Sequence, residues 1–585
     1  MIPELNSELS VIFGSMAAIY DYLGSNERFR ALAYKKVSRV LKSLNEDITV
    51  FINNNTLDEI PGVGEGIADK IREYVSTGKI SKYEELKEKV PFELMEMLNI
   101  SGFGPESLRQ IHKELNINTK EELIKAINNG SIARLRNFGI RKVENMMRGL
   151  KLHKKAEERM SLWLALQLSE SIAGELKKLK EITQIEVAGS IRRKKESIGD
   201  IDILVSCKPE NRRKIIKAFI SLKICKNVLL KGDTKASIIV KHDDRQIDLR
   251  IVEENEWGAA LLYFTGSKEH NIFLRSLAKE KGYKINEYGV FNVKDNKRIA
   301  GKTETEIYKL LGFQWIPPEM REDKGEYKLA EKNKIPKLVE IDNLKGDMQM
   351  HSRWSDGLNS IEELASFVMK NYPYEYIVLT DHSKAERVAG GMDENKFREQ
   401  NKKIKAINLK LEKEFIKTGA EVDILADGSL DLSNDLLSEL DWVCASIHSG
   451  FNKDNTERLI SACRNPYVCC IGHPTGRLIG KREEYKADWK RIFKVAAETG
   501  TAMEINSQPD RMDLNDELSE LARQQGVMLT ISTDSHSLSD LAFISLGVWI
   551  ARRAWCTAAD ILNTAGWETV RKFALKKRDL FTNSN

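Results

Sequence analysis

Three aspartates, two of them separated by a single residue, are the first group whose types and spacing indicate chemistry. In the run GDIDILV, alternation along a strand places Asp200 and Asp202 on one face and the intervening apolar residues on the other. A later run, RQIDLRIV, adds Asp248 between apolar neighbours. Carboxylates this close repel one another unless a cation lies between them. Three of them can hold two Mg²⁺ ions, one activating a 3′-hydroxyl and the other clamping a triphosphate.

Histidines form the second group. Five of the nine follow residue 345, each in a polar cluster after an apolar, strand-like run. The clusters are GDMQMHSRWSDG, YIVLTDHS, DWVCASIHSGF, CCIGHPTGR and LTISTDSHS, with Glu421 similarly placed in TGAEVDIL. Strands that alternate with helical stretches and end in polar groups predict an α/β barrel with its site at the C-terminal ends of the strands. Imidazoles with carboxylates favour Zn²⁺, Mn²⁺ or Fe²⁺, and a cluster of such metals activates water for phosphoester hydrolysis.

Glycine turns punctuate residues 1–150, which otherwise consist of short helical patterns. IPGVGEGIADKI and ISGFGPESLRQI each place a G-x-G turn before a helix, and LRNFGIRKVENM is a partial third copy. Glycine allows positive φ and close approach, and the next helix N-terminus offers free N–H groups to a phosphate. The turns resemble the helix-hairpin-helix, which binds the DNA backbone without reading its sequence. The resemblance implies DNA contacts at Gly62, Gly64, Gly102 and Gly104.

Composition and charge fit this picture. A chain of 585 residues is too long for one hydrophobic core. Residues 151–320 hold 33 basic and 24 acidic residues, a net charge of +9, whereas residues 1–150 are neutral overall. A basic middle segment suits a surface that follows phosphates. The seven scattered cysteines do not indicate a disulfide framework, and the N-terminus lacks a signal-peptide pattern. We therefore expect a soluble, cytoplasmic protein.

The aspartate motif also carries a family resemblance. VAGSIRRKKESIGDIDILVS combines G-S-x-R-R with G-D-x-D, and YFTGSKEHN is followed by FLRSLAKEKGYKINEYGVF. Together they resemble the palm and thumb of family X DNA polymerases, the relatives of DNA polymerase beta. The resemblance implies catalytic, metal-binding roles for Asp200, Asp202 and Asp248, and a template contact at Arg275. It implies nucleotide contacts at Ser190, Arg193, Gly199, Tyr263, Phe264, Gly266 and Asn271. Ile198 replaces a small hydroxyl residue of the vertebrate pattern, so we expect looser nucleotide binding.

A second resemblance concerns the N-terminus. FRALAYKKVSRVL, followed by the first glycine turn, resembles the lyase domain of the same polymerases. In that domain a lysine forms a Schiff base with the sugar of an incised abasic site, which implies this role for Lys70, with phosphate contacts at Tyr34 and Lys35. Gly66 stands where the family has a further lysine. A role for Lys70 in phosphate binding alone stays open.

The order of the histidine clusters resembles the polymerase-and-histidinol-phosphatase (PHP) domain of bacterial family X polymerases. The resemblance implies the metal ligands His351, Asp356, His382, Glu421, His448, His473, Asp534 and His536. The family pattern opens with His-x-His, whereas Gln349 stands first here. Because a glutamine oxygen is a weak neutral ligand, one of up to three metal positions is expected to be loose or empty. The resemblance implies Mn²⁺-dependent 3′-to-5′ exonuclease activity and abasic-site processing, with Mn²⁺ or Zn²⁺ as the bound metal. A phosphomonoesterase acting on a small molecule stays open.

The expected architecture is multidomain: an all-α region, an α/β nucleotidyltransferase palm with a thumb, and a distorted β/α barrel. The expected ranges are a lyase-like domain at 1–85, a helix-hairpin-helix domain at 86–150, the palm at 151–255, the thumb at 256–320, a linker at 321–340 and the PHP domain at 341–585. LLGFQWIPPEMRE closes the thumb with a double proline, and charged residues follow it.

The expected function is the filling of short DNA gaps and trimming of 3′ ends in base excision repair. DNA and deoxynucleoside triphosphates are the expected partners of a monomer with no organic cofactor and no membrane contact. Two alternatives stay open. The PHP domain could be only a structural metal module, or the whole chain a DNA-binding scaffold without catalysis.

Overall fold

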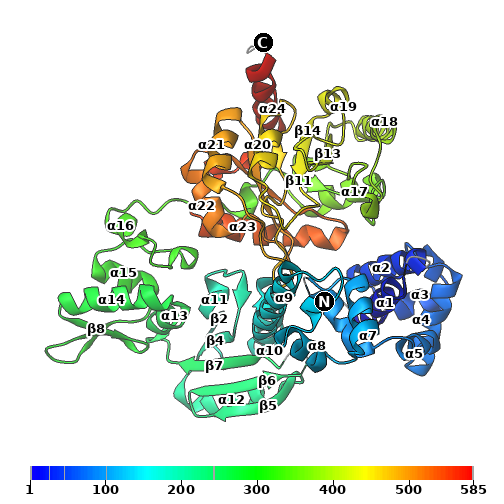
Figure 1. Cartoon of the computed structure of the whole chain (residues 1–585). Helices are drawn as coiled ribbons and strands as arrows, with labels where there is room; N and C mark the ends of the chain where they lie inside the picture. The colour runs from blue at the N-terminus through cyan, green and yellow to red at the C-terminus, as the bar shows by residue number, and fades with distance from the viewer. Residues whose placement is uncertain (1–2, 25–26, 45, 101, 242–243, 583–585) are drawn as a thin grey trace.

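Four structured regions follow one another along the chain (Figure 1). The computed structural model describes residues 3–24, 27–44, 46–100, 102–241 and 244–582. Helices dominate the N-terminal region, a five-stranded and a three-stranded sheet form the middle, and a ring of parallel strands forms the C-terminal region. Within the described ranges, no helix has the length and apolar character needed to cross a lipid bilayer.

The N-terminal region is built from helices joined by the expected glycine turns. Gly64 and Gly104 are the N-caps of α4 and α7, and Gly62 and Gly102 have φ values of +87° and +96°. A Cβ on Gly102 would lie 3.0 Å from the backbone of Met146, so close helix packing also requires glycine there. The helices are α1 (Glu4–Leu23), α2 (Arg28–Ser43), α3 (Ile48–Asn53), α4 (Glu65–Thr77), α5 (Ser81–Glu88), α6 (Phe92–Met95), α7 (Pro105–Leu115), α8 (Lys120–Asn128) and α9 (Ile140–Glu158).

The palm is a five-stranded sheet in the order β2-β4-β7-β6-β5, in which only β4 and β7 pair in parallel. Alternation along β4 sends Ile201, Ile203 and Val205 into a core shared with α10 and α12. The opposite face of the sheet carries Asp202 and Asp248. The strands are β2 (Gln184–Val187), β4 (Ile201–Ser206), β5 (Cys225–Lys231), β6 (Lys235–Val240) and β7 (Gln246–Val252). The helices are α10 (Leu162–Lys177), α11 (Gly189–Arg192) and α12 (Arg212–Ile220), and β1 (Met160–Ser161) pairs with β3 (Ser197–Ile198).

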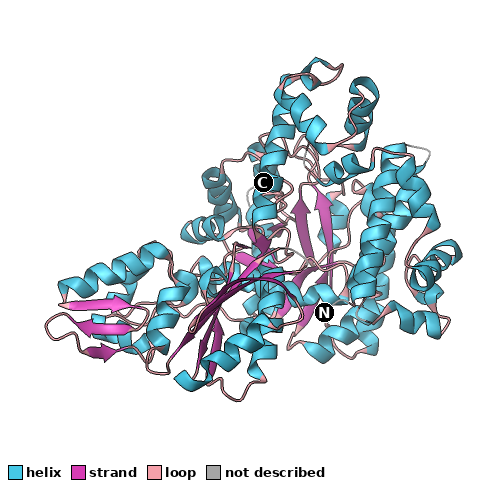
Figure 2. Ribbon diagram, turned by 90° about the horizontal axis from the view of Figure 1, so that it is seen from below, coloured by secondary structure: helices cyan, strands magenta, loops and turns pink. Residues whose placement is uncertain are grey.

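The thumb joins helices to a small antiparallel sheet of order β10-β9-β8, which stands at one end of the molecule in Figure 2. Its elements are α13 (Trp257–Thr265), α14 (Lys268–Glu280), β8 (Tyr283–Asn286), β9 (Gly289–Asn292), β10 (Arg298–Ala300) and α15 (Glu304–Leu311). Glu304 connects this region to the palm. Its oxygens lie 2.7 and 2.9 Å from the guanidinium of Arg192 and 2.7 and 3.1 Å from that of Arg321.

The expected linker at 321–340 is folded in its first part, contrary to the prediction. The Arg321 side chain is fully buried against Glu304, and Glu326 at the start of α16 (Glu326–Glu331) lies 2.7 Å from His270 Nδ1. Ala330 packs in the thumb core. Charged residues predict solvent exposure only when they have no partners, and here oppositely charged groups meet inside the thumb.

The C-terminal region is a nearly closed ring of seven parallel strands in sequence order. A bridge between Met350 and Ser535 brings the two end strands together. The strands are β11 (Gly346–Met350), β12 (Tyr376–Leu379), β13 (Ile416–Asp423), β14 (Trp442–Ser446), β15 (Cys470–Ile471), β16 (Ala502–Asn506) and β17 (Leu529–Ser532). The helices are α17 (Ile361–Asn371), α18 (Glu394–Lys410), α19 (Asn434–Glu439), α20 (Thr456–Arg464), α21 (Trp489–Thr499), α22 (Asp516–Gln524), α23 (Ile544–Arg553) and α24 (Trp567–Thr582). This is the predicted α/β barrel.

The stability of the palm–thumb junction gives a first prediction. Replacing Glu304 by alanine leaves two arginines, one of them fully buried, without a carboxylate partner. Loss of one partner from a buried ion pair costs about 3–5 kcal/mol. We expect Glu304→Ala to lower the unfolding free energy by that amount in denaturant titrations. The exposed Glu280→Ala on α14 is the control, and an equal effect of both variants would contradict the expectation.

Candidate active sites

The palm aspartates lie where two parallel strands run side by side. Asp202 of β4 is the direct register partner of Asp248 of β7, and Asp200 precedes β4. Burial, followed by the negative charges of Asp200 and Asp248, raises the pKa of Asp202 to about 7. Asp248 accepts hydrogen bonds from Ser237 Oγ at 2.5 Å and Gln246 Nε2 at 3.0 Å.

Repulsion among the carboxylates of Asp200, Asp202 and Asp248 fits a site for a divalent cation. Hard carboxylate oxygens are the ligands that Mg²⁺ prefers, and its charge would relieve the strain between them. Among the described residues, however, all groups of three or more potential metal ligands whose donor atoms lie within 4.8 Å of one another are in the barrel. The three palm carboxylates are therefore more widely spaced than a closed metal site, and the two-ion role stays a prediction.

Gly189 begins the segment 189–199 beside these aspartates, called the phosphate loop below because Ser190, Arg193 and Gly199 are the predicted triphosphate contacts. It has a φ of +62°, and a Cβ on it would lie 2.6 Å from Asp202 Oδ2. The preceding Ala188 N–H donates to the carbonyl of Asp202 at 2.8 Å. Only glycine allows the loop to pass this close to the carboxylate.

The predicted nucleotide contacts gather around this loop. Ser190 lies within α11, and Gly199 directly precedes Asp200. Arg193 donates through Nη1 to the carbonyl of Thr265 and through Nε to Glu322 Oε1 at 3.1 Å. Ile198 is fully buried in β3, so its hydrophobic side chain serves packing.

The turn between α13 and α14 presents the other predicted pocket residues. Tyr263 and Phe264 pack edge to face with ring centroids 5.2 Å apart, and Gly266 follows with a φ of +70°. Asn271 Nδ2 donates to the carbonyl of Tyr263 at 2.8 Å, and Arg275 Nε donates to that of Asn271 at 3.3 Å. These bonds use one nitrogen of each side chain, and the predicted contacts of Asn271 and Arg275 with nucleotide and DNA stay predictions.

The three residues predicted to act in a lyase site differ in their burial and contacts. The ring of Tyr34 is buried, stacked between Phe13 and Tyr20 at 5.7 and 5.5 Å, which places it in the core instead of on the DNA surface. Lys35 pairs with Asp21 at 2.5 Å, and the half-buried Lys70 donates to the carbonyl of Gly66 at 2.7 Å. The DNA roles of these residues stay predictions.

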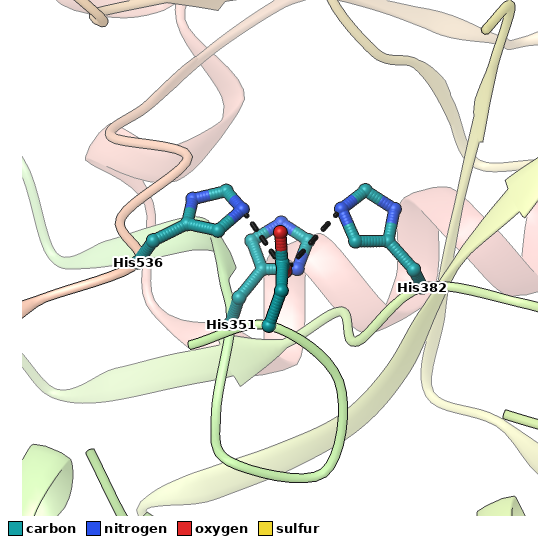
Figure 3. A group of neighbouring side chains, drawn as sticks. His351, His382 and His536 are labelled. Carbon is teal, nitrogen blue, oxygen red and sulfur yellow. Dashed lines mark ion pairs between the residues drawn. The ribbon is translucent and has the colours of Figure 1, made fainter. Parts of the chain in front are cut away.

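The predicted barrel ligands come together at the C-terminal ends of the strands. Figure 3 shows the imidazoles of His351, His382 and His536 converging from three different segments. Glu421 of β13 stands at the centre of the cluster. Its oxygens lie 3.4 Å from His351 Nε2 and His382 Nδ1, 3.3 Å from His448 Nε2 and 2.8 Å from His473 Nε2. Asp534 lies 3.0 Å from His351 Nε2, and Asp356 lies 3.2 Å from His536 Nε2.

These donors fit a cluster of metal ions. His351 Nδ1, His473 Nδ1 and Glu421 Oε2 are buried polar atoms without a hydrogen-bond partner. Such atoms cost free energy unless a ligand satisfies them. Burial lowers the pKa of His382 to about 3, so its imidazole is neutral at physiological pH, the form that binds a metal. Three overlapping groups drawn from the predicted ligands have atoms within 4.8 Å of one another.

Gln349 departs from the other residues of the cluster. Its side chain is 1% exposed, and Oε1 accepts a hydrogen bond from Cys444 Sγ at 3.1 Å. Its Nε2 atom is buried without a hydrogen-bond partner. The oxygen that could bind a metal thus accepts a hydrogen bond from a thiol, and the weakened metal ligand stays a prediction.

Comparisons with known proteins cover all four regions. Family models match at residues 4–80 (helix-hairpin-helix domain), 165–254 (DNA polymerase beta palm), 260–322 (DNA polymerase beta thumb) and 347–508 (PHP domain). The "DNA polymerase/3'-5' exonuclease PolX" of Bacillus subtilis (strain 168) is 35% identical over 566 residues, which cover 96% of this chain and 98% of the relative. This chain belongs to the bacterial family X DNA polymerases that carry a PHP domain.

More distant family X polymerases match a shorter part of the chain. DNA polymerase lambda of Arabidopsis thaliana is 25% identical over 54% of this chain and 62% of its own length. DNA polymerase lambda of Rattus norvegicus is 24% identical over 52% of this chain and 54% of its own length.

Several residues of this family X polymerase join the PHP site without having been predicted. Asp423 lies 3.1 Å from His448 Nδ1 and orients that ring, and Asn506 Nδ2 donates to Asp534 Oδ2 at 3.0 Å. Asp381 accepts from Ser352 N at 2.9 Å and so shapes the loop that carries Asp356. Only Asp423 had a signal in the sequence, since it shares one strand face with Glu421.

A glycine substitution tests the phosphate loop. We expect Gly189→Ala to lower the rate of primer extension by about 10- to 100-fold, because the new Cβ would displace the Asp202 carboxylate. Single-turnover extension measures the effect. Gly174→Ala is the control, since a Cβ there meets no atom within 4 Å. A normal rate in the first variant would contradict the placement of the loop.

A second substitution tests the altered ligand. We expect Gln349→His to raise the affinity of the PHP site for Mn²⁺ by about tenfold or more, because imidazole is a stronger ligand than an amide oxygen. Metal content after dialysis and titration calorimetry would measure it. Gln349→Leu keeps the approximate shape without a ligand atom and should bind Mn²⁺ like the wild type. Equal affinities of the histidine and leucine variants would show that position 349 faces no metal.

Proposed function

We propose that this chain is a template-directed DNA polymerase that fills short gaps during DNA repair and trims 3′ ends with its PHP domain. The convergence of all eight predicted PHP ligands in one buried cluster is the observation that supports trimming most directly. Adjacent Asp202 and Asp248 on parallel strands support nucleotide addition. Mg²⁺ at the palm and Mn²⁺ or Zn²⁺ at the PHP site are the proposed metals.

A nucleic-acid substrate for the PHP site is favoured over a small phosphomonoester. Arg39 of α2 reaches Asp356 of the PHP site with Nη1 and Oδ2 3.4 Å apart. Leu358, two residues further, packs with the core of the helical region. The region expected to bind the DNA backbone therefore borders the hydrolytic site directly. The Bacillus subtilis relative, named a DNA polymerase and 3′-5′ exonuclease, agrees with this choice.

Within the two sites the chain's own residues have distinct tasks. A metal pair at the palm would supply activation of the primer hydroxyl and charge neutralisation. Ser190, Arg193 and the backbone at Gly199 would hold the triphosphate, and Tyr263 and Phe264 would enclose the sugar. In the PHP site the carboxylates and imidazoles would hold metals, and Asp423 would keep His448 in one orientation. Lys70 is the proposed nucleophile of an additional abasic-site lyase, supported by its exposed amine.

Separation of the two activities tests the proposal. Asp202→Ala should abolish primer extension and leave 3′ trimming in Mn²⁺ intact. His382→Ala should do the reverse and lower trimming by at least about 100-fold, because losing groups that only orient a ligand already costs 10- to 100-fold. Extension, exonuclease assays and metal analysis on both full-length variants provide the measurement. A fully metallated protein with no trimming and no effect of His382→Ala would favour a structural metal module, and extension surviving Asp202→Ala would overturn the palm assignment.

A further inference from the structure

One carboxylate at the junction of palm, thumb and PHP domain is shared by two arginines. Glu322 Oε1 accepts from Arg193 Nε at 3.1 Å and from Arg553 Nη1 at 3.0 Å. Arg193 belongs to the phosphate loop of the palm, Glu322 follows the thumb helices, and Arg553 is the last residue of α23 in the barrel. In Figure 1, α23 lies on the side of the barrel that faces α11 and the thumb.

Arg553 is held firmly where it is. Its side chain is 5% exposed, and Nη2 donates to Asp516 Oδ2 of α22 at 2.7 Å. Nη1 also donates to the backbone carbonyl of Arg193 at 2.8 Å. The barrel thus contacts both the main chain of the phosphate loop and the carboxylate that pairs with the side chain of Arg193.

Glu322 carries its negative charge in this setting. Burial favours the neutral acid, but the guanidinium groups of Arg553 and Arg193 outweigh it and lower the pKa of Glu322. An incoming triphosphate competes with this carboxylate for the guanidinium of Arg193. When Arg193 turns to the triphosphate, Glu322 is left half-buried with Arg553 as its remaining arginine partner. Without Arg553, release of Arg193 would leave the desolvated Glu322 carboxylate without an arginine partner, which costs free energy.

We propose that Arg553 of the PHP domain is a positioning residue for nucleotide binding in the polymerase site. It neutralises Glu322 so that Arg193 can be transferred to the triphosphate, and it fixes the loop through the carbonyl of Arg193. The inference rests on the proposed polymerase function and on the triphosphate role of Arg193. It makes the PHP domain part of the polymerase site in addition to its own hydrolytic chemistry.

The neighbouring Arg552 provides a matched control. It lies on the same helix and the same interface, where Nε donates to Glu319 Oε1 at 2.8 Å and Nη1 to the carbonyl of Val339 at 3.0 Å. No hydrogen bond described for Arg552 reaches Arg193 or Glu322. A general weakening of the interface should therefore follow from either substitution, whereas an effect through Glu322 should follow from Arg553→Ala alone.

The experiment measures the Kd of a correct dNTP on full-length protein bound to a gapped DNA with a dideoxy-terminated primer. Arg553→Ala should raise this Kd about tenfold, in line with the loss of a hydrogen bond between charged groups, with the single-turnover rate at saturating dNTP unchanged. Arg552→Ala should stay within about twofold of wild type. Glu322→Gln added to Arg553→Ala should restore binding, because the competing charge is gone. A structural role alone would not give this rescue.

The outcomes separate the inference from the proposed function. A wild type without primer extension refutes the polymerase assignment itself. Extension with an unchanged Kd in Arg553→Ala, an equal effect of Arg552→Ala, no rescue by Glu322→Gln, or no effect of Arg193→Ala overturns the inference. If Arg553→Ala does not fold, the single variant Glu322→Gln tests the inference. Its Kd for the dNTP should be lower than that of wild type. An unchanged or higher Kd in that variant counts against the proposal.

Discussion

Parallel strands place acidic groups side by side in this protein, and their mutual repulsion disfavours the ionised form of each carboxylate unless a cation binds. Asp202 and Asp248 face each other across β4 and β7, and burial with neighbouring charge raises the pKa of Asp202 to about 7. In the barrel, strands ending at one edge deliver Glu421 and the imidazoles to a single buried cluster. The backbone register therefore fixes both constellations before any metal binds, and the loops around them are shaped to keep that register.

Paired charges lie at the junctions between the regions, beside a hydrophobic core that the palm and the barrel share. Glu304 joins palm to thumb through two arginines, and Glu322 joins both to the barrel through two more. A buried ion needs a partner in good geometry, so such contacts specify one arrangement of the domains. A more exposed ion pair, between Arg39 and Asp356, lies between the helical region and the barrel. Arg193 of the palm thus contacts residues of both the thumb side and the barrel.

Local rules of sequence predicted much of the fold and of the sites. The glycine turns before α4 and α7, the alternation along β4 and the barrel strands each depend on a few neighbouring residues, and the structure confirms them. Sequence patterns did not show contacts whose partners are distant in the chain. Arg321 and Glu326 fall in the expected linker, but they are buried beside Glu304 and His270. The ring of Tyr34 packs between Phe13 and Tyr20, and its phosphate contact stays a prediction.

The sequence by itself determined the chemistry available to this protein, because residue type and short-range spacing decide which groups share a strand or a turn. It identified Asp202, the histidine clusters and the departure at Gln349. Tertiary structure alone decided which groups meet. Cys444 donates a hydrogen bond to the side-chain oxygen of Gln349, and Asp423 orients His448. Arg553 and Arg193 both pair with Glu322. These pairs are 95, 25, 231 and 129 residues apart in the chain. The arrangement of strands within the barrel brings the first two pairs together, and the packing of the barrel against the palm and thumb brings the two arginines to Glu322.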